Sequence, residues 1–469
     1  MIINVADDIR RIIEAEKIPH WDVYTQRTLQ GDLHLIGYNI ETIRDAESFG
    51  YAIRSFGKKE GKIGIGMSSG SLLGEKQIMD RVLVAKRNSE VPNAPAYDIP
   101  QQDTFSEVKI TDPKIIQSSE EVIKDKAEEL ASLLKDQKGV VPTFTRLDAY
   151  VVETGILNSS GLSAEKNETF LYLELALKSE EGGKLAEYWI PLYFRGADEL
   201  NLKERIPYWS KLAVDNLHAK PPKTEKTTVV MPPHVIHELL KSGLAIGTVG
   251  YHASGRAKFE NKSKFSVDKK VAGENITIED DGLLDFGIAT SPFDDEGVPQ
   301  RTKTIIENGI FKEVLYDTVY AAATGQKSTG NGIKVPRPPS IDMKFAGNVV
   351  NQGTNIVVKG GNFQSFDELI EDIKHGIYVV GFAWLYPDDL TSSFGTKITN
   401  GYLIENGELT TPLKGGQVSG FAFDHMGETL ELGLMNKVSG MTKTPILAGK
   451  VAAPYMRFED VQVSGPSTS

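Results

Sequence analysis

The sequence predicts an α+β fold, with a helix-flanked antiparallel sheet region followed by a mostly β C-terminal domain. Three observations predict this class. Strand-like runs crowd the first half of the chain between a few stretches with helical apolar spacing. The polar segment HAKPPKTEK at 218–226 carries consecutive prolines and separates the two regions. Beyond it, alternating apolar runs joined by turn sequences outnumber helical patterns.

The length of 469 residues predicts two or three domains. We expect an N-terminal α+β sheet domain at 1–100, a middle α+β segment at 101–220 that packs with it, and a mostly β domain at 226–469. The prolines between Val91 and Gln101 mark the first connector, because they continue neither a helix nor a central strand.

Composition excludes several classes of function. Acidic residues outnumber basic ones by 64 to 52, and no Lys/Arg-dense stretch occurs, so we expect no nucleic-acid binding. The longest nearly apolar run, Gly376 to Tyr386, is too short to span a membrane, and the N-terminus turns acidic at Asp7. We therefore expect a cytoplasmic protein without membrane contact. The chain has no cysteine, which excludes thiol nucleophiles and Cys-ligated metals.

The N-terminal region should begin with a short amphipathic helix that ends before Pro19. Several short strands separated by glycine-containing turns are predicted between His20 and Ser68. Gly64, Gly66 and Gly70 follow a strand, but their spacing lacks the βαβ context of a dinucleotide loop. We expect a tight turn there that leads into a helix from Leu72 to about Arg87, capped by Ser71.

The middle segment contains the clearest helix of the chain. Ser118 and Glu121 form a capping-box pattern before an apolar stripe, and Gly139 suits the C′ position. Two strands should then pair across the SEEGGK turn, and Pro191 places the second of them at a sheet edge.

In the C-terminal region, two Glu-Asn-Gly sequences at 307–309 and 405–407 favour type I′ hairpins. One helix is predicted from a capping box at Ser365 and Glu368, ending at Gly376.

Two groups of residues could carry chemistry. His234, His237 and Glu238 would share one helix face, with His252 as a remote third ligand. Their order, H-x-x-H-E, matches neither H-E-x-x-H nor H-x-x-E-H, so an ordinary helix start is the favoured interpretation. The acidic turns at 279–282 and 294–297 could bind a hard cation, but neither matches an EF-hand loop, and we expect solvated turns.

The string GIATSPFDDEGVPQRTKTIIENGIFKEVLYDTVYAAATGQKSTGNG at 287–332 resembles the TldD/PmbA (TldE) family of predicted metallopeptidases. Further matches at LNSSGL, KHGIYV and YLIENGELTTPLKG extend the resemblance over nearly the whole chain. It implies an α+β N-terminal region and a barrel-like C-terminal domain. Its signature positions here are Ser291, Pro292, Phe293, Asp294, Asp295, Glu296, Gly297, Thr329, Gly330, Asn331 and Gly332.

The family contains two kinds of subunit that differ at the metal. In TldD-like chains, H-E-x-x-x-H and a late cysteine hold zinc, and the Glu activates water. Placed after Leu240, that motif falls on Lys241, Ser242 and Ile246; started at His237, its second histidine falls on Ser242. The cysteine position falls near 439–441, where this chain has none. The resemblance therefore implies a TldE-like subunit with no catalytic or metal-binding residues of its own.

The expected function follows from this resemblance. We expect a subunit of a cytosolic metallopeptidase complex that acts on peptides or unfolded segments. Its partner would be a TldD-like catalytic subunit that carries the zinc, and the chain would form a homo-oligomer when that partner is absent. Two alternatives stay open: a zinc peptidase that uses His234, His237 and His252 with Glu238 as base, or a homo-oligomeric peptide-binding protein.

Overall fold

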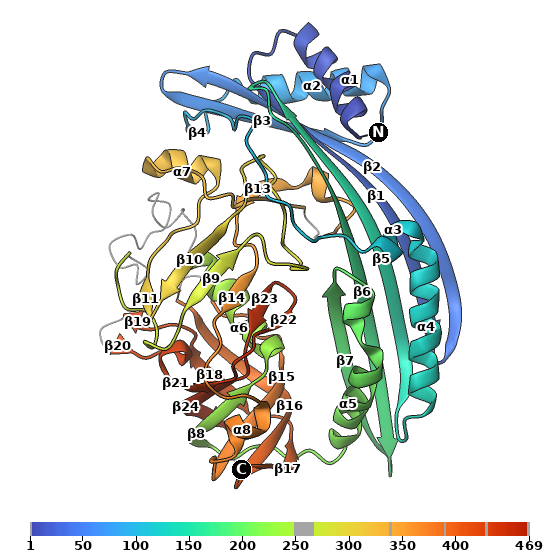
Figure 1. The fold of residues 1–469 in the computed structure, drawn as a ribbon, viewed down its shortest axis with the longest axis vertical. Coiled ribbons are helices and arrows are strands. Elements are labelled where there is room, and N and C mark those ends of the chain that lie inside the picture. The colour runs from blue at the N-terminus through green and yellow to red at the C-terminus, as the bar shows by residue number, and fades with distance from the viewer. Residues whose placement is uncertain (1, 248–266, 337–339, 389–390, 427–429, 467–469) are drawn as a thin grey trace.

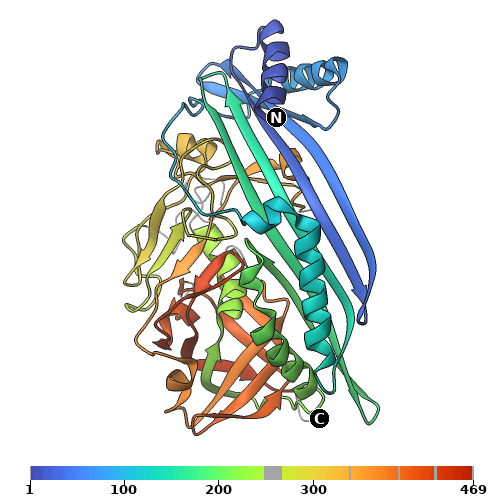
Figure 2. The same ribbon diagram turned by 45° about the vertical axis from the view of Figure 1, so that its right-hand side comes forward.

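The computed structural model describes residues 2–247, 267–336, 340–388, 391–426 and 430–466. It confirms the predicted α+β class. A long twisted sheet stands along one side of the molecule, and the C-terminal domain packs along the other (Figure 1). Figure 2 shows helices lying on the long sheet, with the C-terminal domain beside them. No described helix is both long and apolar enough to cross a bilayer.

The long sheet has seven strands in the order β4-β3-β2-β1-β5-β6-β7, and all neighbouring pairs are antiparallel. It joins strands from 1–100 and from 101–220. Pro191 lies in the edge strand β7, as predicted. The strands are β1 Trp21–Ile36, β2 Asn39–Lys59, β3 Lys62–Gly70, β4 Ala94–Pro95, β5 Val141–Asn158, β6 Ser163–Glu181 and β7 Lys184–Phe194.

The expected series of short strands with glycine turns is wrong, because β1 and β2 are single strands of 16 and 21 residues. Gly31 and Gly50 lie inside them. A Cβ at Gly31 would lie 3.1 Å from the Ile123 side chain, and one at Gly50 would overlap the ring of Phe345. These glycines permit close approach of neighbouring elements rather than chain reversal.

Five helices accompany this sheet. A cluster of buried apolar residues joins α1 and α2 to the upper part of one face, and another joins α4 and α5 to its lower part. In the lower cluster, Leu33, Leu147 and Leu173 pack with Ile123 and Leu130. The helices are α1 Ile2–Ala15, α2 Glu75–Asn88, α3 Pro113–Gln117, α4 Ser119–Lys135 and α5 Leu202–Asp215.

Two helix boundaries differ from the prediction. Ser118 caps α4 as expected, but the helix ends at Lys135, and Gly139 takes its positive φ in the following turn. Gly74, not Ser71, precedes α2. Gly64 and Gly66 lie in β3, where a Cβ would overlap the backbone at the end of α2. The predicted tight turn is therefore wrong, because the glycines serve helix-on-strand packing.

The C-terminal domain contains a closed five-stranded barrel, which confirms the barrel-like expectation. Its strands run β15-β8-β24-β18-β16, and β16 pairs back to β15. The edge strand β17 extends it, β21 pairs with β24, and α6 packs its apolar residues into the same core. The elements are β8 Glu225–Met231, α6 Pro233–Gly247, β15 His375–Ala383, β16 Ser393–Glu405, β17 Glu408–Leu413, β18 Gln417–Phe421, β21 Val438–Met441 and β24 Met456–Ser464.

A second sheet of this domain runs β11-β10-β9-β14-β23-β22. Both predicted Asn-Gly hairpins occur, with positive φ at Asn308, Gly309, Asn406 and Gly407. The remaining elements are β9 Ile278–Asp281, β10 Thr302–Glu307, β11 Ile310–Phe311, α7 Thr318–Thr324, β12 Gly332–Val335, β13 Asn348–Asn351, β14 Ile356–Val358, α8 Phe366–Ile370, β19 His425–Met426, β20 Leu430–Glu431, β22 Ile446–Ala448 and β23 Val451–Ala453.

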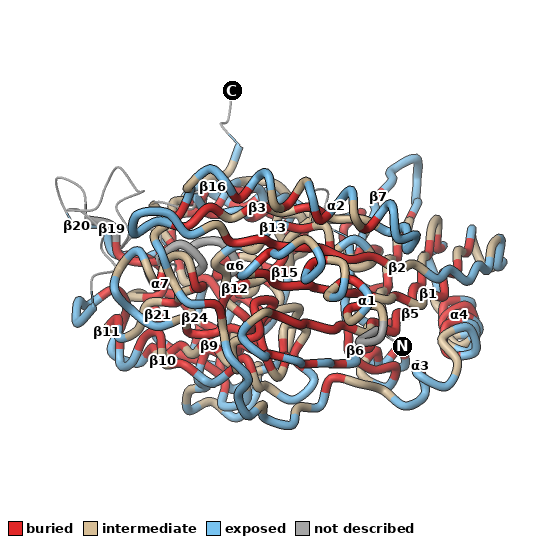
Figure 3. Tube along the Cα trace, turned by 90° about the horizontal axis from the view of Figure 1, so that it is seen from above, coloured by how far each residue is buried: buried red, intermediate tan, exposed pale blue. Residues whose placement is uncertain are grey.

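Ser365 caps α8 as predicted, but the helix ends early and Gly376 lies in β15. In Figure 3, buried segments run through the centre of both regions, whereas exposed segments gather on outer turns and helix faces. The predicted domain limits near residues 100 and 220 stay a prediction.

Candidate functional site

The family-signature residues come together in the structure. The loop at 291–297 lies beside the turn at 329–332, where Gly332 donates its N–H to Asp294 at 2.9 Å. The expectation of a solvated acidic turn is wrong. Asp294, Asp295 and Glu296 have exposed fractions of 1%, 4% and 2%, because the loop is packed between the long sheet and its own domain.

Backbone groups hold Asp294 in place. Its carboxylate accepts N–H groups from Glu296 and Val298 as well as Gly332, each at 2.9 Å. Burial and the adjacent charge of Glu296 raise its pKa to about 8, although the three donors favour the ionised form. Gly297 closes the turn with a φ of +87°. This carboxylate thus shapes the loop.

Glu296 connects the loop to the N-terminal sheet. Arg54 of β2 donates to Glu296 at 2.9 Å and to Asp22 of β1 at 2.6 Å. On the other side, Thr318 at the start of α7 donates both its hydroxyl and its N–H to Glu296. A buried cation therefore joins two carboxylates from different regions of the chain.

Asp295 and Ser291 make further links. Lys344 pairs with Asp295 at 2.9 Å, while Lys334 donates its N–H to the same carboxylate. Lys166 of β6 donates to Ser291 at 2.8 Å and pairs with Glu168 at 3.1 Å. The loop is thus held by charged groups on both sides, and we call this set of contacts around residues 291–297 the buried lock.

Arg195 adds a fully buried guanidinium that pairs with Glu168 at 3.1 Å. It also donates to the carbonyl oxygens of Gly287, Ile288 and Thr290. Burial opposes ionisation of Glu168, but the charges of Lys166 and Arg195 outweigh it and lower its pKa to about 2. This cluster fixes the backbone that precedes the signature loop.

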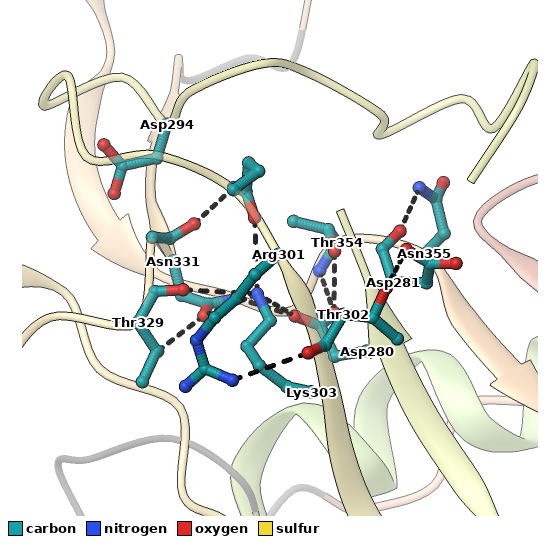
Figure 4. Close-up of polar contacts among 12 residues, drawn as sticks. Asp280, Asp281, Asp294, Arg301, Thr302, Lys303, Thr329, Asn331, Thr354 and Asn355 are labelled. Carbon is teal, nitrogen blue, oxygen red and sulfur yellow. Dashed lines mark hydrogen bonds and ion pairs between the residues drawn. The ribbon is translucent and has the colours of Figure 1, made fainter. Parts of the chain in front are cut away.

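The other acidic segment is not a turn either. Asp280 lies in β9, is fully buried, and pairs with Lys303 of β10 at 2.7 Å. Asn331 donates to Asp280 at 3.0 Å, and Lys303 reaches the carbonyl of Thr329. Figure 4 shows these side chains converging from the two strands and the 329–331 turn. The charges that could have held a cation are already balanced.

Two buried polar side chains, Tyr24 and Lys334, lie beside the buried lock. The Tyr24 hydroxyl has no hydrogen-bond partner among the described residues, and the Lys334 ammonium lies 5.2 Å from the centre of its ring. Burial and the nearby charge of Arg54 lower the pKa of Lys334 to about 7. The sequence itself carries one signal of the buried charges around the lock. Lys166 and Glu168 lie on one face of β6 and place charged side chains there between apolar ones.

The described donors of the alternative site, His234, His237 and Glu238, lie on α6. The ring Nε2 of His234 lies 2.6 Å from the carbonyl oxygen of Val380, and burial lowers its pKa. His237 lies 3.9 Å from Glu238 and packs over Gly449. His252 and the side chains of 241–247 lie outside the described residues.

The described donors alone do not complete a zinc site, and the predicted third ligand, His252, lies outside the described residues. A zinc ion needs three or four convergent ligands, and within the described ranges no group of three His, Cys, Asp or Glu residues could hold a metal. The hard-cation interpretation of the acidic segments fails on the same ground.

The comparisons with known proteins agree with this architecture. Residues 224–465 match the model of the PmbA/TldA metallopeptidase C-terminal domain, which is more than half of the chain. The chain belongs to the PmbA/TldA metallopeptidase family. Within this family, the matched region begins where β8 enters the barrel and ends with β24.

A "Metalloprotease TldD homolog" of Buchnera aphidicola is 29% identical over 303 residues, which cover 61% of this chain and 58% of that protein. This chain therefore spans little more than half the length of that relative. A "Metalloprotease" of Methanothermobacter thermautotrophicus is 25% identical over 446 residues, with coverage of 92% and 89%. The crystal structure of TldE from Thermococcus kodakarensis shares the fold, with a TM-score of 0.83, 20% identity and coverage of 98% and 100%.

Proposed function

We propose that this chain is a TldE-like, metal-free subunit of a cytosolic metallopeptidase complex that acts on peptides or unfolded segments. Its partner would be a TldD-like subunit with H-E-x-x-x-H and a late cysteine. One observation carries the proposal: a family member without any cysteine has lost a zinc ligand, whichever way the helix motif is aligned.

The Nε2 of His234 faces the Val380 carbonyl at 2.6 Å, so that nitrogen fixes α6 against β15. Only the Nδ1 of this ring is left to bind a metal, which leaves the zinc content of the chain to experiment. The role left to this chain is architectural, in that its rigid barrel and long sheet would enclose the partner's active site.

The zinc content of the purified chain tests the metal assignment first. We expect no stoichiometric zinc by elemental analysis after dialysis. One tightly held zinc per chain, lost on His234→Ala or His237→Ala, would instead favour the rearranged zinc peptidase with Glu238 as base.

Reconstitution tests the subunit role. Co-expression with a TldD-like partner should give peptide cleavage that neither protein shows alone. The triple change His234→Ala, His237→Ala and Glu238→Ala should leave this activity within a few fold. The partner's Glu→Ala change in H-E-x-x-x-H should abolish it, because that residue would activate the water.

The same assay separates the alternatives. Metal-dependent cleavage by the isolated chain, abolished by Glu238→Ala, would overturn the proposal. Peptide binding without cleavage, unchanged when the partner is added, would favour the homo-oligomeric peptide-binding protein.

A further inference from the structure

Lys303, Asp280 and Asn331 form a triad of buried polar side chains in the C-terminal domain. Lys303 lies in β10, Asp280 in β9, and Asn331 in the turn that precedes β12. Their exposed fractions are 1%, 0% and 0%. Figure 4 shows the three side chains meeting between the two strands and the turn. The proposed function makes no use of this triad, although Asn331 belongs to the family signature.

The amine of Lys303 lies beside the side-chain amide of Asn331. Its Nζ is 3.2 Å from Oδ1, the oxygen bonded to the amide carbon Cγ. The Thr329 hydroxyl lies 2.7 Å from the same oxygen, closer than its 3.2 Å contact with the Tyr316 carbonyl. A hydroxyl that donates to a carbonyl oxygen draws electron density from the carbonyl carbon. The structure therefore places a nucleophilic nitrogen next to a polarised amide.

One oxygen of Asp280 contacts both nitrogen atoms of this pair. Its Oδ2 lies 2.7 Å from the Nζ of Lys303 and accepts the Nδ2–H of Asn331 at 3.0 Å. Its Oδ1 accepts the Thr354 hydroxyl at 2.9 Å, which fixes the carboxylate. A carboxylate in this position can take a proton from an attacking nitrogen and give one to a leaving nitrogen.

We propose that Lys303 and Asn331 become joined by an amide bond, a cross-link within the chain between β10 and the 329–332 turn. A proton first passes from the Nζ of Lys303 to Asp280. The Nζ lone pair then attacks Cγ of Asn331, the Nζ–Cγ bond forms, and the Cγ–Nδ2 bond breaks. A second proton passes from Nζ to Nδ2 through Asp280, so Nδ2 leaves as ammonia and Asp280 ends as a carboxylic acid. The reaction consumes no further reactant.

Burial favours this reaction. The contacts within the triad replace a chance encounter of an amine with an amide, and water is excluded from the reacting groups. A buried ammonium and carboxylate are costly to keep, whereas the products are an amide and a carboxylic acid without charge. The cross-link would close a ring through residues 303–331 that includes α7, whose Thr318 donates to Glu296 of the buried lock.

Peptide mapping of the purified chain tests the cross-link. Trypsin cleaves after lysine and arginine, but not after a lysine whose Nζ is in an amide bond. We expect a branched peptide in which 302–312 is joined to 328–334, lighter than the two peptides together by about 17 Da, the mass of one ammonia. Fragmentation should place the link between Lys303 and Asn331. Cleavage after Lys303, with an unmodified 328–334 peptide, would overturn the proposal.

The branch, and not the loss of mass alone, decides the result. Asn331 precedes Gly332, and an Asn-Gly sequence can also lose ammonia when the side chain closes on the following backbone nitrogen. That product has the same mass change but no branch. A linear 328–334 peptide lighter by about 17 Da would therefore also overturn the proposal.

Three variants test the role of each group. Asp280→Asn should abolish the branched peptide, because an amide does not accept the proton. Glu279→Gln makes the same kind of change at the next residue of β9, which pairs with Lys359 outside the triad, and should leave the branch intact. Lys303→Arg keeps a positive charge beside Asp280 but presents a guanidinium that does not lose its proton, so the 328–334 peptide should be linear.

Circular dichroism shows whether each variant is folded. A branched peptide in the folded Asp280→Asn chain would overturn the role assigned to that carboxylate. If this variant does not fold, the peptide map of the wild-type chain still decides whether the cross-link exists.

Discussion

The two halves of one face of the long sheet carry similar charged residues but have different surroundings. In the upper half, Arg54 and Lys166 are buried; Arg54 pairs with Glu296 of the signature loop and Lys166 with Glu168 of β6. In the lower half, Arg44 and Arg146 lie on a face without such a cover, with side chains 64% and 35% exposed. The same alternation along the strands thus gives a buried lock at one end and an open surface at the other.

The difference shows that burial under other parts of the chain, more than residue type, decides how much an ion pair contributes to stability. Water screens an exposed pair, so its contribution to stability is small. A buried pair cannot lose one member without leaving a charge in a region of low polarity. Substitutions in the upper half should therefore cost far more stability than matched substitutions in the lower half.

Arg54→Ala should have the largest effect. It leaves Asp22 and Glu296 buried without their shared cation, which should lower the free energy of unfolding by about 3–5 kcal/mol. Urea unfolding followed by circular dichroism measures this change. Arg301→Ala, at an exposed pair of the C-terminal domain, is the control, and a loss similar to the control's would remove the distinction between buried and exposed ion pairs.

Glu168→Gln should make stability depend less on pH. The folded-state pKa of Glu168 is about 2, below its ordinary 4.5, so its ionisation stabilises the fold above pH 4.5 and this is lost as the pH falls toward 2. The variant should be about 3 kcal/mol less stable at pH 7. Unfolding measured from pH 7 to 3 should show the two proteins converging; a constant difference would contradict this.

Lys334→Met should stabilise the protein at pH 7. The folded-state pKa of Lys334 is about 7, below its ordinary 10.5, so wild-type stability falls as the pH drops from 10.5 toward 7. Removing the buried ammonium should gain about 1–2 kcal/mol at pH 7, a gain that shrinks toward pH 10. Thermal unfolding at pH 7 and pH 10 measures it, and a variant that is less stable at both values would show that Lys334 has a hidden partner.

Arg44→Ala should have the smallest effect on the monomer. Its pair with Asp32 at 2.8 Å lies in the lower half of this sheet face, and the arginine side chain is 64% exposed. We expect a loss in the free energy of unfolding below about 1 kcal/mol, measured by urea unfolding. A loss as large as that of Arg54→Ala would mean that the lower half is covered in the monomer.

The features that the sequence predicted correctly depend on neighbours in the chain. The Ser118 side chain caps α4 by accepting the N–H of Glu121, three residues away. The Asn308-Gly309 turn needs positive φ values, which these two residues adopt easily. Alternation in β6 already showed which residues would face a core. The absence of cysteine is likewise visible in the sequence alone, and comparison with the family motif shows that it removes a zinc ligand.

Other features depend on contacts between residues far apart in sequence. Gly31 and Gly64 have the sequence context of turn glycines, but both lie in strands. Glycine is needed there because α4 and the end of α2 approach these strand positions closely. Nothing near Glu296 in the chain indicates its pairing with Arg54, which lies 242 positions earlier.

The sequence alone therefore determined the local elements and the family, because caps, hairpin turns and alternation are short-range and their motifs are contiguous. Only the tertiary structure decided that the acidic signature is a buried lock and that the lower half of the same sheet face is left uncovered. A carboxylate in a turn is solvated or paired according to what packs over it, and that cover comes from distant parts of the chain.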